Sequence, residues 1–180
     1  MRVRPFYIAA GLGALLQTLY AAFSSLLAYF LVPTGLRVLE NLPPTVFGFT
    51  TVVGCFGAIL APLVHIGTGI LYAYLHGREA PLAAEDGAIG GAASAATARL
   101  ISGLFAAITG LFLTPILVSR LAGPTPPQFS PNDFPFLVIP TLVTAVGSLV
   151  GLCFAVIIAG AVGALGGVLG SVWANRRSRP

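Results

Sequence analysis

The chain has 180 residues, of which 57% are hydrophobic and only 8% are charged, and its mean hydropathy is +0.96. Such a composition excludes a water-soluble globular protein. At about 20 apolar residues per crossing, the chain has room for roughly four membrane-spanning helices and no separate soluble domain. The sequence therefore predicts an all-α, polytopic membrane protein, with residues 1–180 forming a single membrane domain and a four-transmembrane-helix bundle.

Four apolar runs follow one another along the chain, at residues 6–32, 46–76, 87–119 and 136–173. The first run carries no charge and far exceeds the roughly 7 to 15 residues of a signal-peptide core. It is therefore predicted to be a retained helix and not a cleaved leader. The proline-containing segments between the runs are predicted to be connections and not domains.

The third run is interrupted by a single arginine, Arg99. Residues 100–119 have the length of one crossing and are framed by Arg99 and Arg120, whose long stems can reach the headgroups. This spacing favours Arg99 at the inner membrane boundary. In the alternative, Arg99 lies within the membrane, where it would cost several kcal/mol unless paired and would mark a functional site.

Small residues recur in the third and fourth runs at steps of three and four, which places them on one helical face. Such faces let helix backbones approach closely in lipid. We expect the two runs to form an antiparallel, glycine-rich hairpin; self-association into an oligomer is the alternative. The predicted packing residues are Gly87, Gly91, Ala95, Gly160, Gly163, Gly167 and Gly170.

Orientation follows from the nine arginines, because basic residues are retained on the cytoplasmic side. With four crossings, only Arg37 and Arg120 fall on one side. The sequence predicts a multi-pass protein of the inner (plasma) membrane with both termini in the cytoplasm. Its use of arginine in place of lysine, with abundant alanine and glycine, indicates a bacterial source with a GC-rich genome.

Catalytic patterns are missing from the sequence. The five acidic residues, Glu40, Glu79, Glu85, Asp86 and Asp133, all fall in predicted connections, and the chain has no lysine and no HExxH, GxSxG or CxxC pattern. No basic face with interleaved aromatic residues lies outside the apolar runs. We expect no enzymatic activity, no metal site and no nucleic-acid binding.

His65 is the one residue in the chain with the chemistry to hold a cofactor, as a single axial ligand to a chlorin or haem, with Gly67 and Gly69 leaving space beside it. His76 lies three turns away, so the two histidines cannot ligate one haem from opposite sides. The alternative is a histidine hydrogen-bonded to a hydroxyl or a backbone carbonyl. Cys55 and Cys153 are expected to be buried and unbridged.

Gln17 lies at membrane depth in the first run, where polar side chains hold helices together. Its expected partners are Thr50, Thr51, Thr109, Thr144 and Ser148. Together these features predict a structural or accessory subunit, or a scaffold, in a larger membrane assembly, whose partners are the lipid bilayer and other membrane proteins. A homo-oligomeric transport or pore-forming protein is the alternative, and a pigment or haem carrier through His65 is a weaker one.

Overall fold

The computed structural model describes residues 3–31, 44–78, 81–122 and 134–177. These residues form four helices: α1 (Val3–Leu31), α2 (Pro44–Gly77), α3 (Ala84–Ala122) and α4 (Phe134–Arg177). Each helix contains a segment long and apolar enough to cross a membrane. The prediction of an all-helical chain with four candidate membrane spans is therefore confirmed, while Glu40, Glu79 and Asp133 lie outside the described residues.

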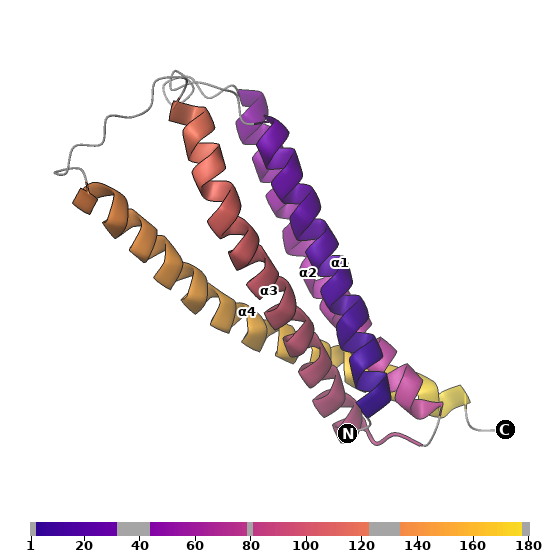
Figure 1. Ribbon diagram of the computed structural model, residues 1–180. Helices are drawn as coiled ribbons and strands as arrows, with labels where there is room; N and C mark the ends of the chain where they lie inside the picture. The colour runs from indigo at the N-terminus through magenta and orange to yellow at the C-terminus, as the bar shows by residue number, and fades with distance from the viewer. Residues whose placement is uncertain (1–2, 32–43, 79–80, 123–133, 178–180) are drawn as a thin grey trace.

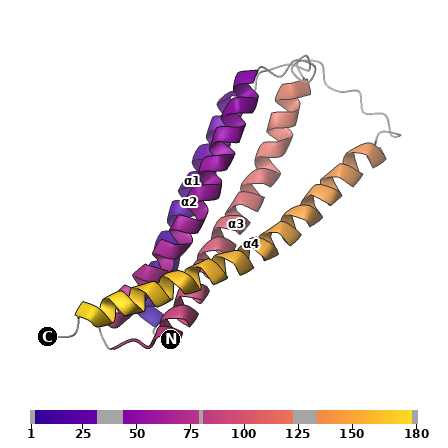
Figure 2. The same cartoon turned by 180° about the vertical axis from the view of Figure 1, so that it is seen from behind.

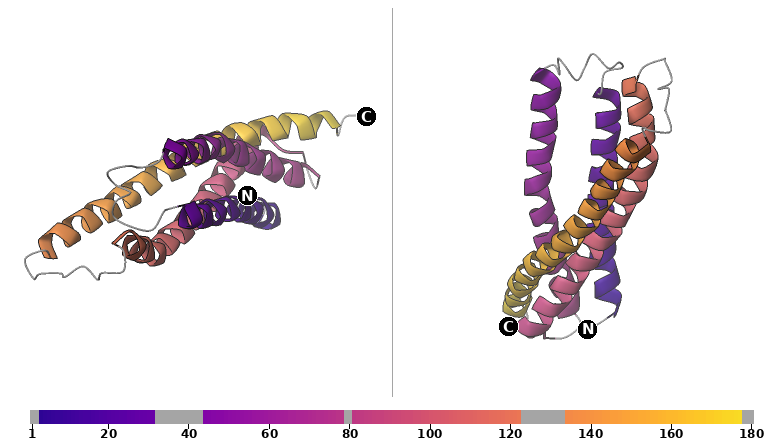
Figure 3. Two further views of the ribbon diagram at one scale, coloured as in Figure 1. Left: turned by 90° about the horizontal axis from the view of Figure 1, so that it is seen from above. Right: turned by 90° about the vertical axis from the view of Figure 1, so that its left-hand side faces the viewer.

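Consecutive helices run in opposite directions, so α1 begins and α4 ends at the same end of the bundle, the lower end in Figure 1. Helices α2 and α3 contact each other. Helix α1 packs against both of them, and helix α4 also packs against both. Within the described ranges α1 and α4 do not contact each other. Figure 3 shows from above that α4 runs obliquely across the other helices and not along them.

The tightest packing lies in the lower half of the bundle, where α2, α3 and α4 meet at two glycines of α4. Gly163 lies against Gly91 and Ala95 of α3, and Gly167 lies against the Gly87 carbonyl of α3. Gly69 of α2 faces the backbone of the same two α4 residues. A Cβ atom at any of these glycines would overlap the neighbouring backbone or side chain, so only glycine permits the observed separation.

The small residues of α4 pack against two neighbouring helices, α2 and α3. Gly166 lies against the backbone of Ile66, and Gly170 lies closest to Ile70 and Ala73, all on α2. The sequence instead predicts that Gly170 packs against the third helix, together with Gly163 and Gly167. The difference arises because a step of three residues turns the helix by about 300°, which moves each new glycine sideways toward α2.

Helix α4 leaves the bundle above this region (Figure 1 and, from behind, Figure 2). Gly103 of α3 still lies against the side chain of Leu152 of α4, but a Cβ at Gly110, one heptad further along α3, would meet no atom within 4 Å. The same is true of Gly147 and Gly151 on α4. The facing surfaces of α3 and α4 are therefore open toward the upper end.

A side-chain amide fixes the beginning of α3 to the end of α4. Asn175 Nδ2 donates to the Leu82 carbonyl at 2.9 Å, and the Leu82 N–H donates to Asn175 Oδ1 at 3.4 Å. Leu82 is itself buried. This double hydrogen bond holds the residue Leu82, shortly before α3, against the last turns of α4.

Two glycine-to-alanine substitutions on α4 test the close packing. Gly167→Ala places a methyl group against the α3 backbone and is expected to lower the free energy of unfolding by about 1–3 kcal/mol. Gly151→Ala meets nothing and is expected to be neutral or stabilising by up to about 1 kcal/mol, because alanine favours the helix. Unfolding by SDS in mixed micelles, followed by circular dichroism, measures both. Equal effects of the two substitutions would contradict the packing at Gly167.

Candidate functional site

Four of the six buried polar side chains among the described residues gather where α1, α2 and α3 meet. The other two, Ser94 and Ser171, donate to backbone carbonyls of their own helices. Gln17 comes from α1, His65 and Thr68 from α2, and Ser102 from α3, and each is less than 9% exposed. We call these four residues the polar cluster. A buried polar group in an apolar surrounding is stable only when it is hydrogen-bonded, and among the described residues no buried side-chain nitrogen or oxygen lacks a partner.

Gln17 connects the three helices through the two ends of its amide. The Ser102 hydroxyl donates to Gln17 Oε1 at 2.9 Å, and Gln17 Nε2 donates to His65 Nδ1 at 3.3 Å. The Ser102 hydroxyl also lies 3.0 Å from the Arg99 carbonyl, one turn back on α3, so its hydrogen is shared between two acceptors. With Nδ1 accepting, the ring proton of a neutral His65 lies on Nε2.

Thr68 completes the polar cluster on the side that faces Gly13 of α1. Its hydroxyl donates to the Val64 carbonyl at 2.7 Å, which satisfies the hydroxyl within its own helix. Gly13 leaves the space that this side chain and Ala98 of α3 occupy. The three helices are thus in register at this level of the bundle.

That register fixes the position of Arg99 along the bundle. Arg99 follows Ala98, which faces Gly13, and Gly13 lies about 15 Å along α1 from Val3. The apolar segment of α1 extends on both sides of this level, from Val3 to Leu27. Arg99 is therefore level with the interior of an apolar segment of α1, and α3 continues as an unbroken helix on both sides of it.

Arg99 lies on α3 between the face that contacts α1 and the face that contacts α4. Ser102, three residues on, faces Gln17 of α1, and Gly103, four residues on, faces Leu152 of α4. Because residues three and four apart lie on the same side of a helix, the Arg99 side chain points between α1 and α4. It is partly exposed there.

The described residues offer Arg99 no carboxylate at its own level. Their two acidic residues, Glu85 and Asp86, lie in the first turn of α3, about 20 Å from Arg99 along the helix. The acidic side chains that the structure describes are thus about four turns away from Arg99. Within this part of the chain, no carboxylate lies at the level of Arg99.

The surroundings of His65 differ from those expected of a cofactor ligand. The ring is buried and hydrogen-bonded to Gln17, and the space at Gly69 is filled by the α4 backbone. Gly67 lies on the exposed side of α2, where a Cβ would meet nothing. These two glycines therefore do not leave a cofactor-sized space beside the ring. The second histidine, His76, is hydrogen-bonded to Tyr72 within α2.

Several other expectations about side chains differ from the structure. The partners of Gln17 are Ser102 and His65, which hydrogen-bond to it in place of the expected hydroxyls, while the side chains of Thr50 and Thr144 lie outside those that the structure describes. The prediction that Cys55 and Cys153 are buried is wrong, since both are exposed and free on the outer helix surfaces. In a membrane, a thiol that faces lipid is as well solvated as one inside the bundle, so hydrophobicity alone does not place it.

No group of three or more histidine, cysteine, aspartate or glutamate side chains that could hold a metal occurs among the described residues. Comparison of the chain with protein-family models, with curated protein sequences and with solved structures finds no match. Its function is therefore inferred from its own residues and their geometry.

Replacement of Gln17 tests the polar cluster. Gln17→Leu removes the partner of His65 Nδ1 and one acceptor of Ser102, so it is expected to lower the free energy of unfolding by about 1–2 kcal/mol. Ser102→Ala is expected to cost less, about 0.6 kcal/mol, because it removes one donor that is shared between two acceptors and leaves the Gln17–His65 hydrogen bond in place. SDS unfolding of both variants and of the double variant measures their coupling. Strictly additive effects would contradict the shared hydrogen bond.

Proposed function

We propose that this protein is a structural, accessory subunit of a larger membrane assembly, with no catalytic chemistry of its own, and that it binds a partner helix carrying a carboxylate. The observation that carries this proposal is Arg99, level with the interior of the apolar segment of α1 and without a nearby carboxylate in the described residues. We infer that Arg99 lies within the membrane and not at its boundary.

The unfavourable free energy of an unpaired arginine within the membrane indicates that Arg99 has a partner. An arginine at the centre of a membrane-spanning helix is unfavourable by several kcal/mol unless it is paired or reaches the headgroups. The side chains of a helix tilt toward its N-terminus, so Arg99 can reach toward the lower end but starts about 15 Å from the beginning of α1. A carboxylate on a neighbouring helix would neutralise it within the membrane.

A second copy of this chain is a poor source of that carboxylate. Glu85 and Asp86 lie near the lower end of α3, and Glu40, Glu79 and Asp133 fall in the predicted connections. This distribution favours a different membrane protein as the partner over a homo-oligomer. A pore also finds little support, since the buried polar side chains that the structure describes all have hydrogen-bond partners within the bundle, either side chains or backbone carbonyls.

The opening beside α4 supports the same proposal. Arg99 points between α1 and α4, the two helices that do not touch, and α4 separates from α3 beyond Gly103 and Leu152. The residues there are apolar or small, including Gly110 of α3 and the exposed Leu149 of α4. A partner helix entering this opening would cover these residues and bring a carboxylate to Arg99.

Within the subunit itself, we propose that α3 and α4 act as an antiparallel, glycine-zipped hairpin that fixes this opening. The contacts of Gly87, Gly91 and Ala95 with Gly163 and Gly167 support this role. A hairpin clamped at its lower end and free above would present the same opening to every copy of the partner.

A designed helix tests whether Arg99 recognises a carboxylate in the membrane. The probe is a poly-leucine peptide with one central glutamic acid, and its matched control carries glutamine at the same position. In phosphatidylcholine vesicles, the glutamic acid peptide is expected to associate with the protein about tenfold more strongly by energy transfer, as one interhelical polar contact provides. Arg99→Gln should abolish this preference, whereas Arg99→Lys should keep most of it.

The native complex provides the matching test in the cell. The tagged chain, extracted in mild detergent, is expected to migrate with a second membrane protein in a fixed ratio, and Arg99→Gln is expected to dissociate it. Arg176→Gln, another exposed arginine, is the control. A homo-oligomer whose mass is unchanged by Arg99→Gln would overturn the accessory role.

We further propose that both termini face the cytoplasm and that the membrane is a bacterial inner membrane. The positions of Arg4, Arg78 and Arg176 at the lower end of the bundle support this orientation, because cytoplasmic ends retain arginine. Tags fused to the two termini are expected to be protected from protease in spheroplasts and digested in inverted vesicles. Protection of only one tag would rule out four crossings.

A further inference from the structure

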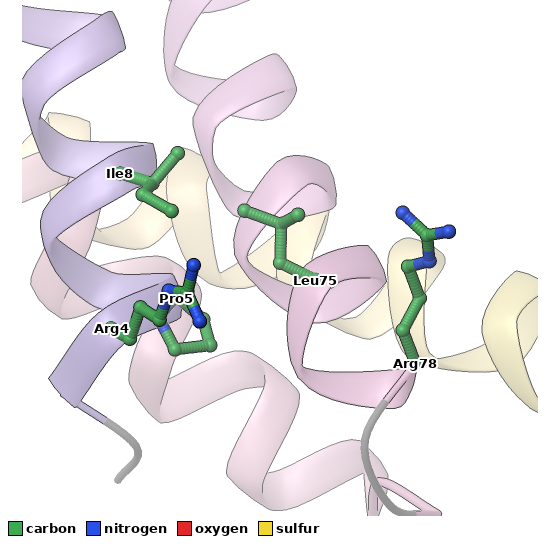
Figure 4. Close-up of a pocket in the computed structure, with 5 residues that line it drawn as sticks. All are labelled: Arg4, Pro5, Ile8, Leu75 and Arg78. Carbon is green, nitrogen blue, oxygen red and sulfur yellow. The ribbon is translucent and has the colours of Figure 1, made fainter.

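A small groove lies between the beginning of α1 and the end of α2. It has a volume of about 270 Å³ and is lined by Arg4, Pro5 and Ile8 of α1 and by Leu75 and Arg78 at the end of α2 (Figure 4). This volume is below the roughly 300–1,000 Å³ of pockets that enclose a whole small molecule. The groove therefore fits one part of a ligand whose remainder lies outside it.

Two guanidinium groups give the groove its charge. Arg4 and Arg78 are both exposed, and Arg78 is placed over the ring of Tyr74, with its Cζ 5.7 Å from the ring centroid. Among the described residues, no carboxylate lines the groove, and the two acidic residues, Glu85 and Asp86, belong to the first turn of α3. The two guanidinium groups give the groove a positive charge, which suits an anionic ligand.

The polarity of the groove changes along the helix axes. Arg4 lies next to the beginning of α1 and Arg78 follows the end of α2, whereas Ile8 and Leu75 lie about one turn further into the apolar segments. Charge at the rim and hydrocarbon below it is the order in which a phospholipid presents its phosphate and its acyl chains. A free anion would make no favourable contact with Ile8 and Leu75, whereas an acyl chain would.

We propose that this groove binds an anionic phospholipid, with the phosphate held between Arg4 and Arg78 and an acyl chain lying along Ile8 and Leu75. Basic pockets between membrane helices at the headgroup level recognise anionic lipids in this way. An anionic lipid fits better than a zwitterionic one, because the ammonium group of the latter would lie close to two guanidinium groups. This site depends on α1 and α2 only, and so does not rest on the accessory role.

Lipid retention after purification tests the site. The protein is reconstituted in nanodiscs of phosphatidylcholine and phosphatidylglycerol at four to one, extracted into detergent, washed, and examined by native mass spectrometry. The wild type is expected to keep one phosphatidylglycerol, and Arg4→Gln combined with Arg78→Gln is expected to lower this retention at least tenfold, as loss of two interfacial cations implies. Arg176→Gln, an exposed arginine of α4 outside the groove, should change it less than twofold.

Three results would overturn the proposal. Equal retention of phosphatidylcholine and phosphatidylglycerol would show that the groove binds lipid through apolar contacts alone. Loss of the lipid on addition of millimolar inorganic phosphate would show that the groove is a site for a free anion. An effect of Arg176→Gln as large as that of the double variant would show attraction by net charge alone. Circular dichroism checks the fold, and each single variant, Arg4→Gln and Arg78→Gln, is expected to show an intermediate loss.

Discussion

Close contact between helix backbones at Gly163 and Gly167 is the constraint on which the rest of this structure depends. Lipid is as apolar as a leucine side chain, so helices in a membrane gain little from burying hydrophobic surface and associate through close packing and polar contacts. At these two glycines α4 meets the backbones of both α2 and α3, with only the methyl group of Ala95 also in the contact at Gly163. This contact fixes the oblique course of α4, and that course in turn leaves its upper half away from the bundle (Figure 1).

The polar cluster supplies the second means of association, where α1, α2 and α3 meet. Gln17 reaches both Ser102 and His65, so one amide holds three helices in register. Close contacts at glycines thus dominate the packing of α4, to which Asn175 adds a hydrogen-bonded contact, and the hydrogen bonds of Gln17 join α1 to α2 and α3. Arg99 lies where these two kinds of packing border each other, on the side where α1 and α4 do not meet.

The two proposed binding sites use arginine in different surroundings. Arg4 and Arg78 lie at the ends of their helices, where a guanidinium can meet a lipid phosphate at little cost. Arg99 is level with the interior of an apolar segment, where the same group requires a counter-charge. A subunit with both would be oriented by lipid at its lower end and joined to its partner within the membrane.

The sequence by itself determined that the chain is all-helical with four candidate membrane spans, because the length and polarity of each apolar run depend only on neighbouring residues. It also singled out Gly163, Gly167, Gln17 and Arg99 as unusual. Only the tertiary structure decided what they face: Ser102 and His65 as partners of Gln17, α2 as the neighbour of Gly170, and the level of Arg99 against α1. Helical periodicity gives the face on which a residue lies, but the register and crossing of helices arise from packing between segments far apart in the chain. The exposed positions of Cys55 and Cys153 show the same limit, since in lipid an apolar side chain is equally stable inside or outside the bundle.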